Sequence, residues 1–182
     1  MANETLKEFR ITFGNKIRRM IWQLTWSLLY RPTPTFMHGW RRCLLRCFGA
    51  HIEAGAHPYP SVRVWAPWNL TMKRHSCLAP HVDCYCVAPV TLEAHAIVSQ
   101  YSYLCTATHD FRSQAFPLVA APIVVGAHAW VTADVFIGPG VTVGEGAVVG
   151  ARSTVVRSVA PWSVVAGPSQ REIGLRPPFE IR

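Results

Sequence analysis

The sequence repeats every six residues, a period that neither an α-helix nor a single strand produces. The repeat is clearest in residues 137–151, IGPGVTVGEGAVVGA, where an aliphatic residue returns at Ile137, Val143 and Val149. The first positions of the units are all apolar: Met72, Leu78, Leu92, Val98, Leu104, Val125, Val131, Ile137, Val143, Val149 and Val155. The fifth positions are all small residues or valine: Ser76, Val82, Ala96, Ser102, Thr108, Ala129, Val135, Val141, Ala147, Ser153 and Val159. One large and one small column are typical of the interior of a stacked coil.

Six residues make one short strand and a corner, and three such units close a triangular turn. Successive turns stack at the ordinary strand spacing of about 4.8 Å. The period therefore predicts an all-β fold, a parallel β-helix over residues 51–168. The register breaks at residues 84–91 and 110–124, where we expect loops that leave the coil and carry functional residues. Residues 169–182 follow the repeat as a C-terminal tail.

The fourth position of each unit is the corner, where the backbone angle φ is positive. Glycine is favoured there, and Asn, Asp and His are tolerated. The residues at this position are His75, His81, His95, Tyr101, Ala107, His128, Asp134, Gly140, Gly146 and Arg152. The corner gives four histidines a structural explanation, so we expect no metal site although His75 and His81 lie one unit apart.

Residues 1–50 precede the repeat as a helical segment. Residues 15–30 suit one helix, which Pro32 would end, and residues 35–48 suit a second. The second helix has an apolar stripe of Phe36, Trp40, Leu44 and Phe48 beside Arg41, Arg42 and Arg46. Such a stripe either packs on the protein's own core or lies on a membrane surface, and we favour packing.

The formal net charge is +8, and much of it lies in the first 46 residues. These basic residues are Lys7, Arg10, Lys16, Arg18, Arg19, Arg31, Arg41, Arg42 and Arg46. We find no nucleic-acid-binding module, so a basic edge facing the phosphates of a membrane or a cofactor fits better. The six cysteines form no paired C-x-x-C array, which argues against a zinc ribbon. We expect a reduced, cytoplasmic protein, at the inner face of the membrane if the helices contact lipid.

His109 departs from the corner pattern. It occupies the sixth position of its unit, in LCTATHDF, directly before the break at residues 110–124. A neutral imidazole is the side chain best suited to removing a proton near neutral pH. His109 is therefore the candidate general base, with a solvated loop histidine as the alternative.

Several motifs resemble those of the hexapeptide-repeat acyltransferases. They are the repeat itself, the T-x-x-H-D segment, IGPGVTVGEGAVVGA and the closing PWSVVAG. The stretches RVWAPWNL, YLCTATHDF and APIVVGAHAWV most resemble the branch that acetylates sugars for exopolysaccharide, of the colanic acid type. This resemblance implies a left-handed coil and a homotrimer with active sites between neighbouring coils. It also implies an O-acetyltransferase, with acetyl-CoA as donor and a free or lipid-linked saccharide as acceptor.

The resemblance also implies roles for individual residues. His109 falls on the family's catalytic base, and Trp130 falls where a tryptophan lines the pantetheine arm of CoA. The residues Ala133 and Ala151 fall where backbone groups meet that arm or the thioester oxygen, and Arg157 and Arg171 fall near positions that meet the CoA phosphates. The candidate to orient the imidazole is Asp110, and the candidates for acceptor contact are Asp83 and Tyr85.

Two other functions remain open on the sequence alone. One is a zinc enzyme similar to the carbonic anhydrases that use this fold, with histidines facing one another across a subunit interface. The other is a non-catalytic β-helix, which would leave His109 and Trp130 without a role. The sequence also departs from the family where the usual ending A-G-x-P-A-K/R reads AGPSQR, so the alignment of Arg171 is less direct.

Overall fold

The computed structural model describes residues 7–9 and 12–177. Arg10, one of the basic residues of the N-terminal segment, lies outside the described residues, as do residues 178–182 of the tail. Helix α1 spans Phe13–Thr25, the π-helical turn η1 continues it over Trp26–Tyr30, and helix α2 spans His38–Cys47. Thr12 caps α1, because its Oγ1 accepts a hydrogen bond from the Asn15 amide at 3.3 Å. The two helical segments predicted over residues 15–30 and 35–48 are confirmed.

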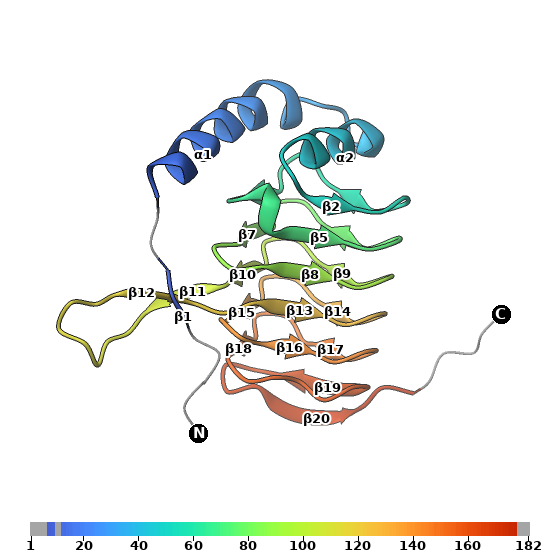
Figure 1. The fold of residues 1–182 in the computed structure, drawn as a ribbon. Coiled ribbons are helices and arrows are strands. Elements are labelled where there is room, and N and C mark those ends of the chain that lie inside the picture. Colours follow the sequence, from blue (N-terminus) through green and yellow to red (C-terminus); the bar gives the residue numbers. More distant parts are fainter. Residues whose placement is uncertain (1–6, 10–11, 178–182) are drawn as a thin grey trace.

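The rest of the chain forms short strands stacked into a left-handed parallel β-helix, with the helices across one end (Figure 1). One face holds β4 (Arg63–Val64), β7 (Asp83–Tyr85), β10 (Tyr103–Cys105), β15 (Phe136–Ile137) and β18 (Thr154–Val155). A second face holds β2 (His51–Ile52), β5 (Leu70–Met72), β8 (Val90–Leu92), β13 (Ile123–Val125) and β16 (Thr142–Val143). The third holds β3 (His57–Pro58), β6 (Cys77–Leu78), β9 (Ile97–Val98), β14 (Trp130–Val131), β17 (Val148–Val149), β19 (Ser163–Ala166) and β20 (Arg171–Leu175). A short 3₁₀ turn, η2, covers Pro67–Asn69.

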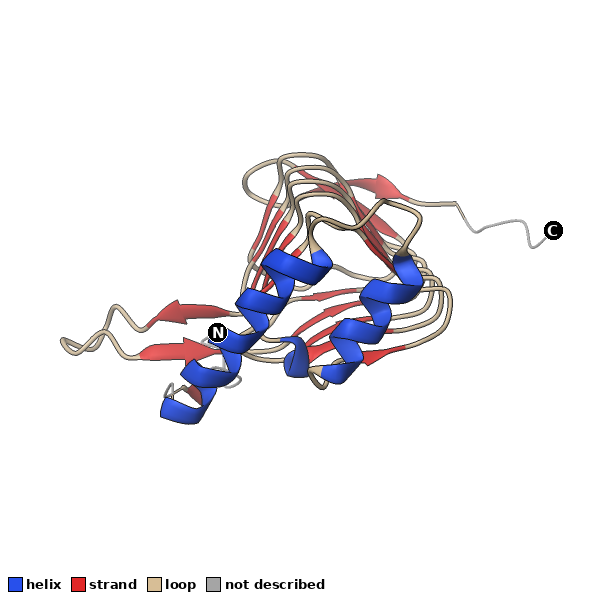
Figure 2. Cartoon of the chain, turned by 90° about the horizontal axis from the view of Figure 1, so that it is seen from above, coloured by secondary structure: helices blue, strands red, loops and turns tan. Residues whose placement is uncertain are grey.

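Seen from above, the stack is triangular and the two helices lie over its end (Figure 2). Every predicted first-position residue is fully buried in this stack, as the aliphatic column requires. Strand β20 pairs antiparallel with β19 and covers the opposite end of the coil. The predicted tail therefore begins with a strand, which the sequence pattern did not indicate.

The corner prediction holds at nine of its ten positions, where φ lies between 56° and 76°. Three of the corner histidines stack ring on ring, with centroids 5.1 Å apart between His75 and His95 and 4.9 Å apart between His95 and His128. Within residues 7–9 and 12–177, no group of three or more His, Cys, Asp or Glu side chains is arranged to hold a metal ion.

The prediction is wrong at Ala107 and Thr108, because the chain leaves the coil earlier than residue 110. Strand β11 (Ala107–His109) pairs antiparallel with β12 (Leu118–Ala120), and β1 (Lys7–Glu8) adds to β12 as a third strand. This β11–β12 hairpin projects sideways from the stack (Figure 1). Ala107 therefore makes no corner, and Thr108 is exposed rather than interior.

The second helix packs on the end of the coil, but not with the whole predicted stripe. Leu44 is buried and Phe48 packs against the core, whereas Phe36 and Trp40 remain exposed. Arg41, expected on the basic face, is completely buried. Its guanidinium donates to the carbonyls of Pro34, Thr35 and Pro58 at 2.5–2.9 Å and to Thr33 Oγ1 at 2.7 Å. Arg41 thus ties the turn between η1 and α2 to the first coil.

Candidate active site

His109 is at the last position of β11, where the hairpin meets its loop. Its side chain is exposed, and its Nδ1 lies 2.7 Å from the carbonyl oxygen of Phe116. A carbonyl oxygen can only accept, so Nδ1 carries the proton and Nε2 keeps its lone pair in the neutral ring. The arrangement therefore presents Nε2 as an unprotonated nitrogen that can take a proton.

Asp110 does not contact the imidazole in this arrangement. Its Oδ1 accepts a hydrogen bond from the Arg112 amide at 3.0 Å and lies 3.3 Å from Arg112 Nε. The group that holds the imidazole is instead the Phe116 carbonyl. Because that group belongs to the main chain, no residue type in the sequence could have identified it.

Asp83 and Tyr85 line a pocket of about 520 Å³ between α1 and the face that carries β4, β7 and β10. We call it the helix pocket. Its walls combine basic, aromatic and apolar side chains: Lys16, Arg19, Met20, Gln23, Leu24, Trp26, Arg63, Val64, Trp65, Asp83, Tyr85 and Tyr103. The structure therefore brings together the two residues proposed for acceptor contact.

The aromatic side chains of the helix pocket form a row. Trp65 and Tyr85 meet edge to face with centroids 5.5 Å apart, and Tyr103 follows 6.3 Å from Tyr85. The guanidinium of Arg19 lies 4.0 Å from the centroid of the Trp65 ring. Rings of this kind offer flat apolar surfaces for the carbon face of a sugar, with charged groups beside them.

Asp83 lies beside Arg63, since β4 and β7 pair these residues in register. Burial raises the pKa of the Asp83 carboxyl, and the Arg63 charge opposes that shift. Burial also raises the pKa of Tyr85 and of Tyr103. Both hydroxyls therefore stay protonated near neutral pH and can donate hydrogen bonds as well as accept them.

The helix pocket and the hairpin share a second, smaller core of Val87, Ala107 and Ala120. Trp65 and Tyr85 of the pocket pack against it, and so does Leu118, the cross-strand partner of His109. The pocket and His109 thus lie on the same side of one chain.

Trp130 lies on a different face, in β14, and is 44% exposed. Its indole N–H donates to Ser99 Oγ at 3.0 Å, which fixes the ring across the strands. It lines a groove of about 460 Å³, the tryptophan groove, whose residues are His75, His95, Ile97, His128, Ala129, Trp130 and Arg176.

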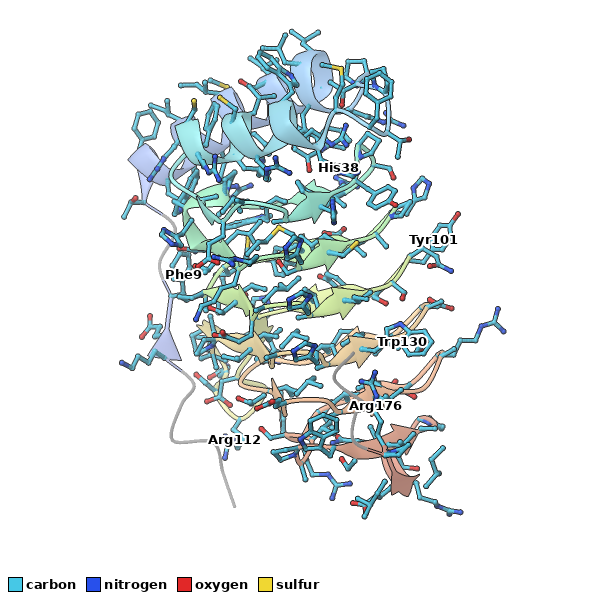
Figure 3. The ribbon with its side chains drawn as sticks, turned by 90° about the vertical axis from the view of Figure 1, so that its right-hand side faces the viewer. Phe9, His38, Tyr101, Arg112, Trp130 and Arg176 are labelled. Atoms are coloured by element: carbon cyan, nitrogen blue, oxygen red, sulfur yellow. The ribbon has the colours of Figure 1, made fainter. Side chains whose placement is uncertain are left out.

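Arg176 closes the tryptophan groove on the side of the C-terminal strand, next to Trp130 in Figure 3. Its guanidinium donates to the carbonyls of His128 at 2.9 Å and Gly146 at 3.0 Å. Sequence reasoning missed this residue, because Arg176 belongs to the segment that was predicted as a tail without register.

The other candidates for CoA contact follow along the coil. Ala133 and Ala151 lie one turn apart, since the Ala133 carbonyl accepts from the Arg152 amide at 3.0 Å. Gln170, the neighbour of Arg171, donates to the Arg157 carbonyl at 2.6 Å and accepts from its amide at 3.0 Å. The structure therefore places the two arginines on neighbouring segments of the last turns, and both are exposed.

A single chain does not bring His109 and Trp130 together. The hairpin extends to one side of the stack, whereas β14 belongs to the face that also holds β9 and β17 (Figure 1). In Figure 3, Arg112 of the hairpin loop lies away from Trp130 and Arg176. The candidate base and the candidate CoA groove are thus on separate surfaces of one chain.

No protein-family model matches the sequence. The chain is 42% identical over 152 residues to WcaF of Escherichia coli strain K12, provisionally named a colanic acid biosynthesis acetyltransferase, and the match covers 84% of this chain and 83% of WcaF. A shorter match of 59 residues, 39% identical, joins 32% of the chain to 28% of a chloramphenicol acetyltransferase from Agrobacterium fabrum.

Solved structures share the fold at lower identity. A maltose O-acetyltransferase from Clostridium difficile 630 has a TM-score of 0.83 at 20% identity, over 95% of this chain and 94% of that one. The hexapeptide-repeat acetyltransferase VCA0836 from Vibrio cholerae, complexed with acetyl-CoA, has a TM-score of 0.79 at 23% identity, over 91% of each chain. The long match to WcaF confirms the resemblance read from the sequence, and the chain belongs to the hexapeptide-repeat acetyltransferases of the colanic acid biosynthesis type.

Proposed function

We propose that the protein transfers the acetyl group of acetyl-CoA to a hydroxyl of a saccharide, as a step in exopolysaccharide biosynthesis. The observation that carries this proposal is the 2.7 Å contact of His109 Nδ1 with the Phe116 carbonyl, which leaves Nε2 free to act as a base. Membership of an acetyltransferase family favours this function over the zinc-enzyme and non-catalytic alternatives.

In the proposed reaction, His109 Nε2 takes the proton of the acceptor hydroxyl as its oxygen attacks the thioester carbonyl. The tetrahedral intermediate then collapses, the carbon–sulfur bond breaks, and the imidazolium returns the proton to the leaving CoA thiolate. No acyl-enzyme forms, so Cys105 needs no role. Holding donor and acceptor in one cleft removes much of the entropic barrier.

For the oxyanion we propose the main-chain amide of Ala133. The amides on either side of it, those of Thr132 and Asp134, donate to the carbonyls of Val149 and Gln100, both at 3.0 Å. Those bonds hold the corner rigidly, and a fixed donor aimed at a developing negative charge is an effective way to stabilise it. Ala151 and Trp130 would contact the pantetheine arm, and Arg157 and Arg171 would bind the CoA phosphates.

We further propose a homotrimer with its active sites between protomers. His109 and Trp130 occupy different faces of one chain, so neither face alone offers both a base and a groove for CoA. In a closed ring of three chains, the hairpin side of one protomer meets the β14 side of the next, and three equal sites result. The helix pocket, with Asp83 and Tyr85, would hold the acceptor beside His109.

For the location we propose the cytoplasm, where acetyl-CoA is made, with the N-terminal helices at the inner face of the membrane. Within the described residues, no helix is long and apolar enough to cross a bilayer.

The proposal is tested by following release of the CoA thiol from acetyl-CoA with a panel of saccharides and lipid-linked saccharides. We expect thiol release that depends on at least one acceptor, with a mass gain of one acetyl group on that acceptor. If no acceptor of either kind is acetylated while acetyl-CoA still binds, the proposed function is wrong.

A further inference from the structure

Phe116 has a left-handed backbone conformation, which a bulky residue rarely adopts. Its φ is 45°, whereas a residue with a large side chain normally keeps φ negative. Among the described residues, the other non-glycine positions with positive φ lie at corners of the coil or in the turn between β19 and β20. Phe116 instead belongs to the β11–β12 hairpin. A strained residue outside a repeating scaffold persists only where its surroundings fix it, and such residues cluster at functional sites.

Main-chain hydrogen bonds close the hairpin loop around Phe116. The amide of Asp110 donates to the carbonyl of Pro117 at 3.1 Å, and the amide of Ser113 donates to the carbonyl of Asp110 at 3.2 Å. The amide of Phe116 itself donates to the carbonyl of Ser113 at 3.0 Å. Because the Phe116 ring is 56% exposed, we attribute the left-handed backbone to these loop bonds and not to packing of the ring.

The backbone conformation of Phe116 decides where its carbonyl points. Rotation about the N–Cα bond moves the carbonyl, and at the observed φ its oxygen lies 2.7 Å from His109 Nδ1. A φ in the usual negative range would turn the carbonyl away while the Phe116 amide stayed bonded to Ser113. In water the neutral imidazole of histidine prefers to carry its proton on Nε2, and that tautomer has no lone pair on the nitrogen proposed as base. The strained conformation therefore holds the ring in its less common tautomer.

Pro117 makes this selection one-sided. An amide N–H beside the ring would donate to Nδ1 and so leave the proton on Nε2. The peptide bond between Phe116 and Pro117 offers a carbonyl but no N–H, because proline lacks a backbone donor. Proline also disfavours the right-handed helical conformation of the residue before it, which is one of the alternatives open to Phe116.

We infer that Phe116 and Pro117 are positioning residues that select the Nδ1-protonated tautomer of His109. This inference rests on the acetyltransferase function proposed above and adds residues that act through the base. The left-handed backbone of Phe116 aims the carbonyl at Nδ1, and Pro117 removes the donor that would select the opposite tautomer. Neither side chain has to touch a substrate.

A pair of substitutions at position 116 separates the backbone from the ring. Asparagine and valine both remove the aromatic ring, but asparagine tolerates a left-handed backbone and a β-branched residue does not. We expect Phe116→Val to lower kcat about tenfold to a hundredfold with the KM for acetyl-CoA nearly unchanged, because the base is misplaced and the donor site is not. The kcat of Phe116→Asn should be about tenfold or more above that of Phe116→Val, with a similar Tm for the two variants.

The tautomer itself is measured by nitrogen-15 NMR of the histidine side chains at alkaline pH, where the ring is neutral. His109→Asn identifies the signals, because they are missing from its spectrum. We expect the Nδ1-protonated form in the wild type and in Phe116→Asn, and a shift toward the Nε2-protonated form in Phe116→Val. Pro117→Ala restores an N–H next to the carbonyl, so it should also raise the share of the Nε2-protonated form and lower kcat.

The matched control is Phe111, which lies in the same loop, is 80% exposed and has no positive φ. Phe111→Asn and Phe111→Val should therefore have equal kcat and leave the tautomer of His109 unchanged. A difference between them as large as that at position 116 would refute the backbone argument.

Three results would overturn the inference. They are an Nε2-protonated His109 in an active wild-type enzyme, a Phe116→Val variant that keeps the wild-type tautomer and kcat, and an equal loss in Phe116→Asn and Phe116→Val. Each of these would leave the acetyltransferase function intact. Conversely, the NMR measurement needs no acceptor, so tautomer shifts as expected in a protein that acetylates no acceptor would support the selection and count against the proposed function.

Discussion

Replacing His109 by asparagine separates the two roles that the structure gives its imidazole. Nδ1 ties the end of β11 to Phe116 across the hairpin, and Nε2 is the proposed base. The asparagine side-chain amide can still donate from near the Nδ1 position, but it has no basic nitrogen where Nε2 was. His109→Asn should therefore keep the hairpin and lose the chemistry.

The expected magnitudes of the two effects differ widely. His109 is exposed, so its hydrogen bond to Phe116 contributes about 0.5–1.5 kcal/mol, most of which asparagine keeps. Loss of a general base lowers the rate by about 10²–10⁴, which corresponds to about 2.7–5.4 kcal/mol of activation free energy. A change in kcat of that size with a nearly unchanged Tm would be a catalytic effect and not a folding effect.

The assay is steady-state thiol release at saturating acetyl-CoA, beside thermal unfolding and acetyl-CoA binding. The matched control is His81→Asn, a corner histidine with φ of 63° whose ring stacks on Tyr101 at 4.9 Å. Asparagine tolerates that backbone, so kcat should stay near the wild-type value. A second control, Asp110→Ala, should cost less than about tenfold, because Asp110 contacts Arg112 and not the ring. If His109→Asn retained near wild-type turnover, or if Asp110→Ala abolished it, the assignment of the base would be wrong.

Three further changes test other parts of the account. Trp130→Ala should weaken acetyl-CoA binding by about tenfold or more in a calorimetric titration with an unchanged fold, and unchanged affinity would restrict the tryptophan to packing. Arg41→Met should lower the free energy of unfolding by about 3 kcal/mol, because it removes the hydrogen bonds that a fully buried guanidinium donates to the carbonyls of Pro34, Thr35 and Pro58, and a neutral result in denaturant titrations would contradict that role. Asp83 has a raised pKa in the fold, so its contribution to stability is present below the ordinary carboxyl pKa and is lost as pH rises through the raised value. Asp83→Asn should therefore remove that part of the decline from the pH profile of Tm, and a profile identical to the wild type would refute the shift.

The coil could be read from the sequence because its constraints act on residue type. A first-position residue such as Ile137 must be apolar to fill the column, and a corner residue such as Asp134 must tolerate positive φ. Stacking imposes a further limit at Gly144, where an added Cβ would come within 2.5 Å of the Pro161 nitrogen. These requirements on residue type recur in every six-residue unit. The pattern therefore remains recognisable from several units together, even where one unit departs from it.

The features that the sequence did not predict do not restrict which residue types can form them. Ala107 and Thr108 suit a corner and an interior position as well as a hairpin strand, so the sequence could not show that the chain leaves the coil before them. The partner of His109 is a main-chain carbonyl, and any residue at position 116 would supply one. An arginine on the basic side of an amphipathic helix is usually exposed, and the carbonyls gathered around Arg41 make its burial favourable.

The central claim is that each active site combines His109 of one protomer with Trp130 of its neighbour, and mixed trimers test it most directly. His109→Ala chains and Trp130→Ala chains are unfolded together in equal amounts, refolded and assayed at subsaturating acetyl-CoA. In a random mixture, about a quarter of the interfaces would join an intact His109 to an intact Trp130, so activity should recover to about a quarter of the wild-type value. If the two residues worked within one chain, no site in the mixture would hold both. Activity of the refolded mixture that stays at the level of the separate variants would contradict the account.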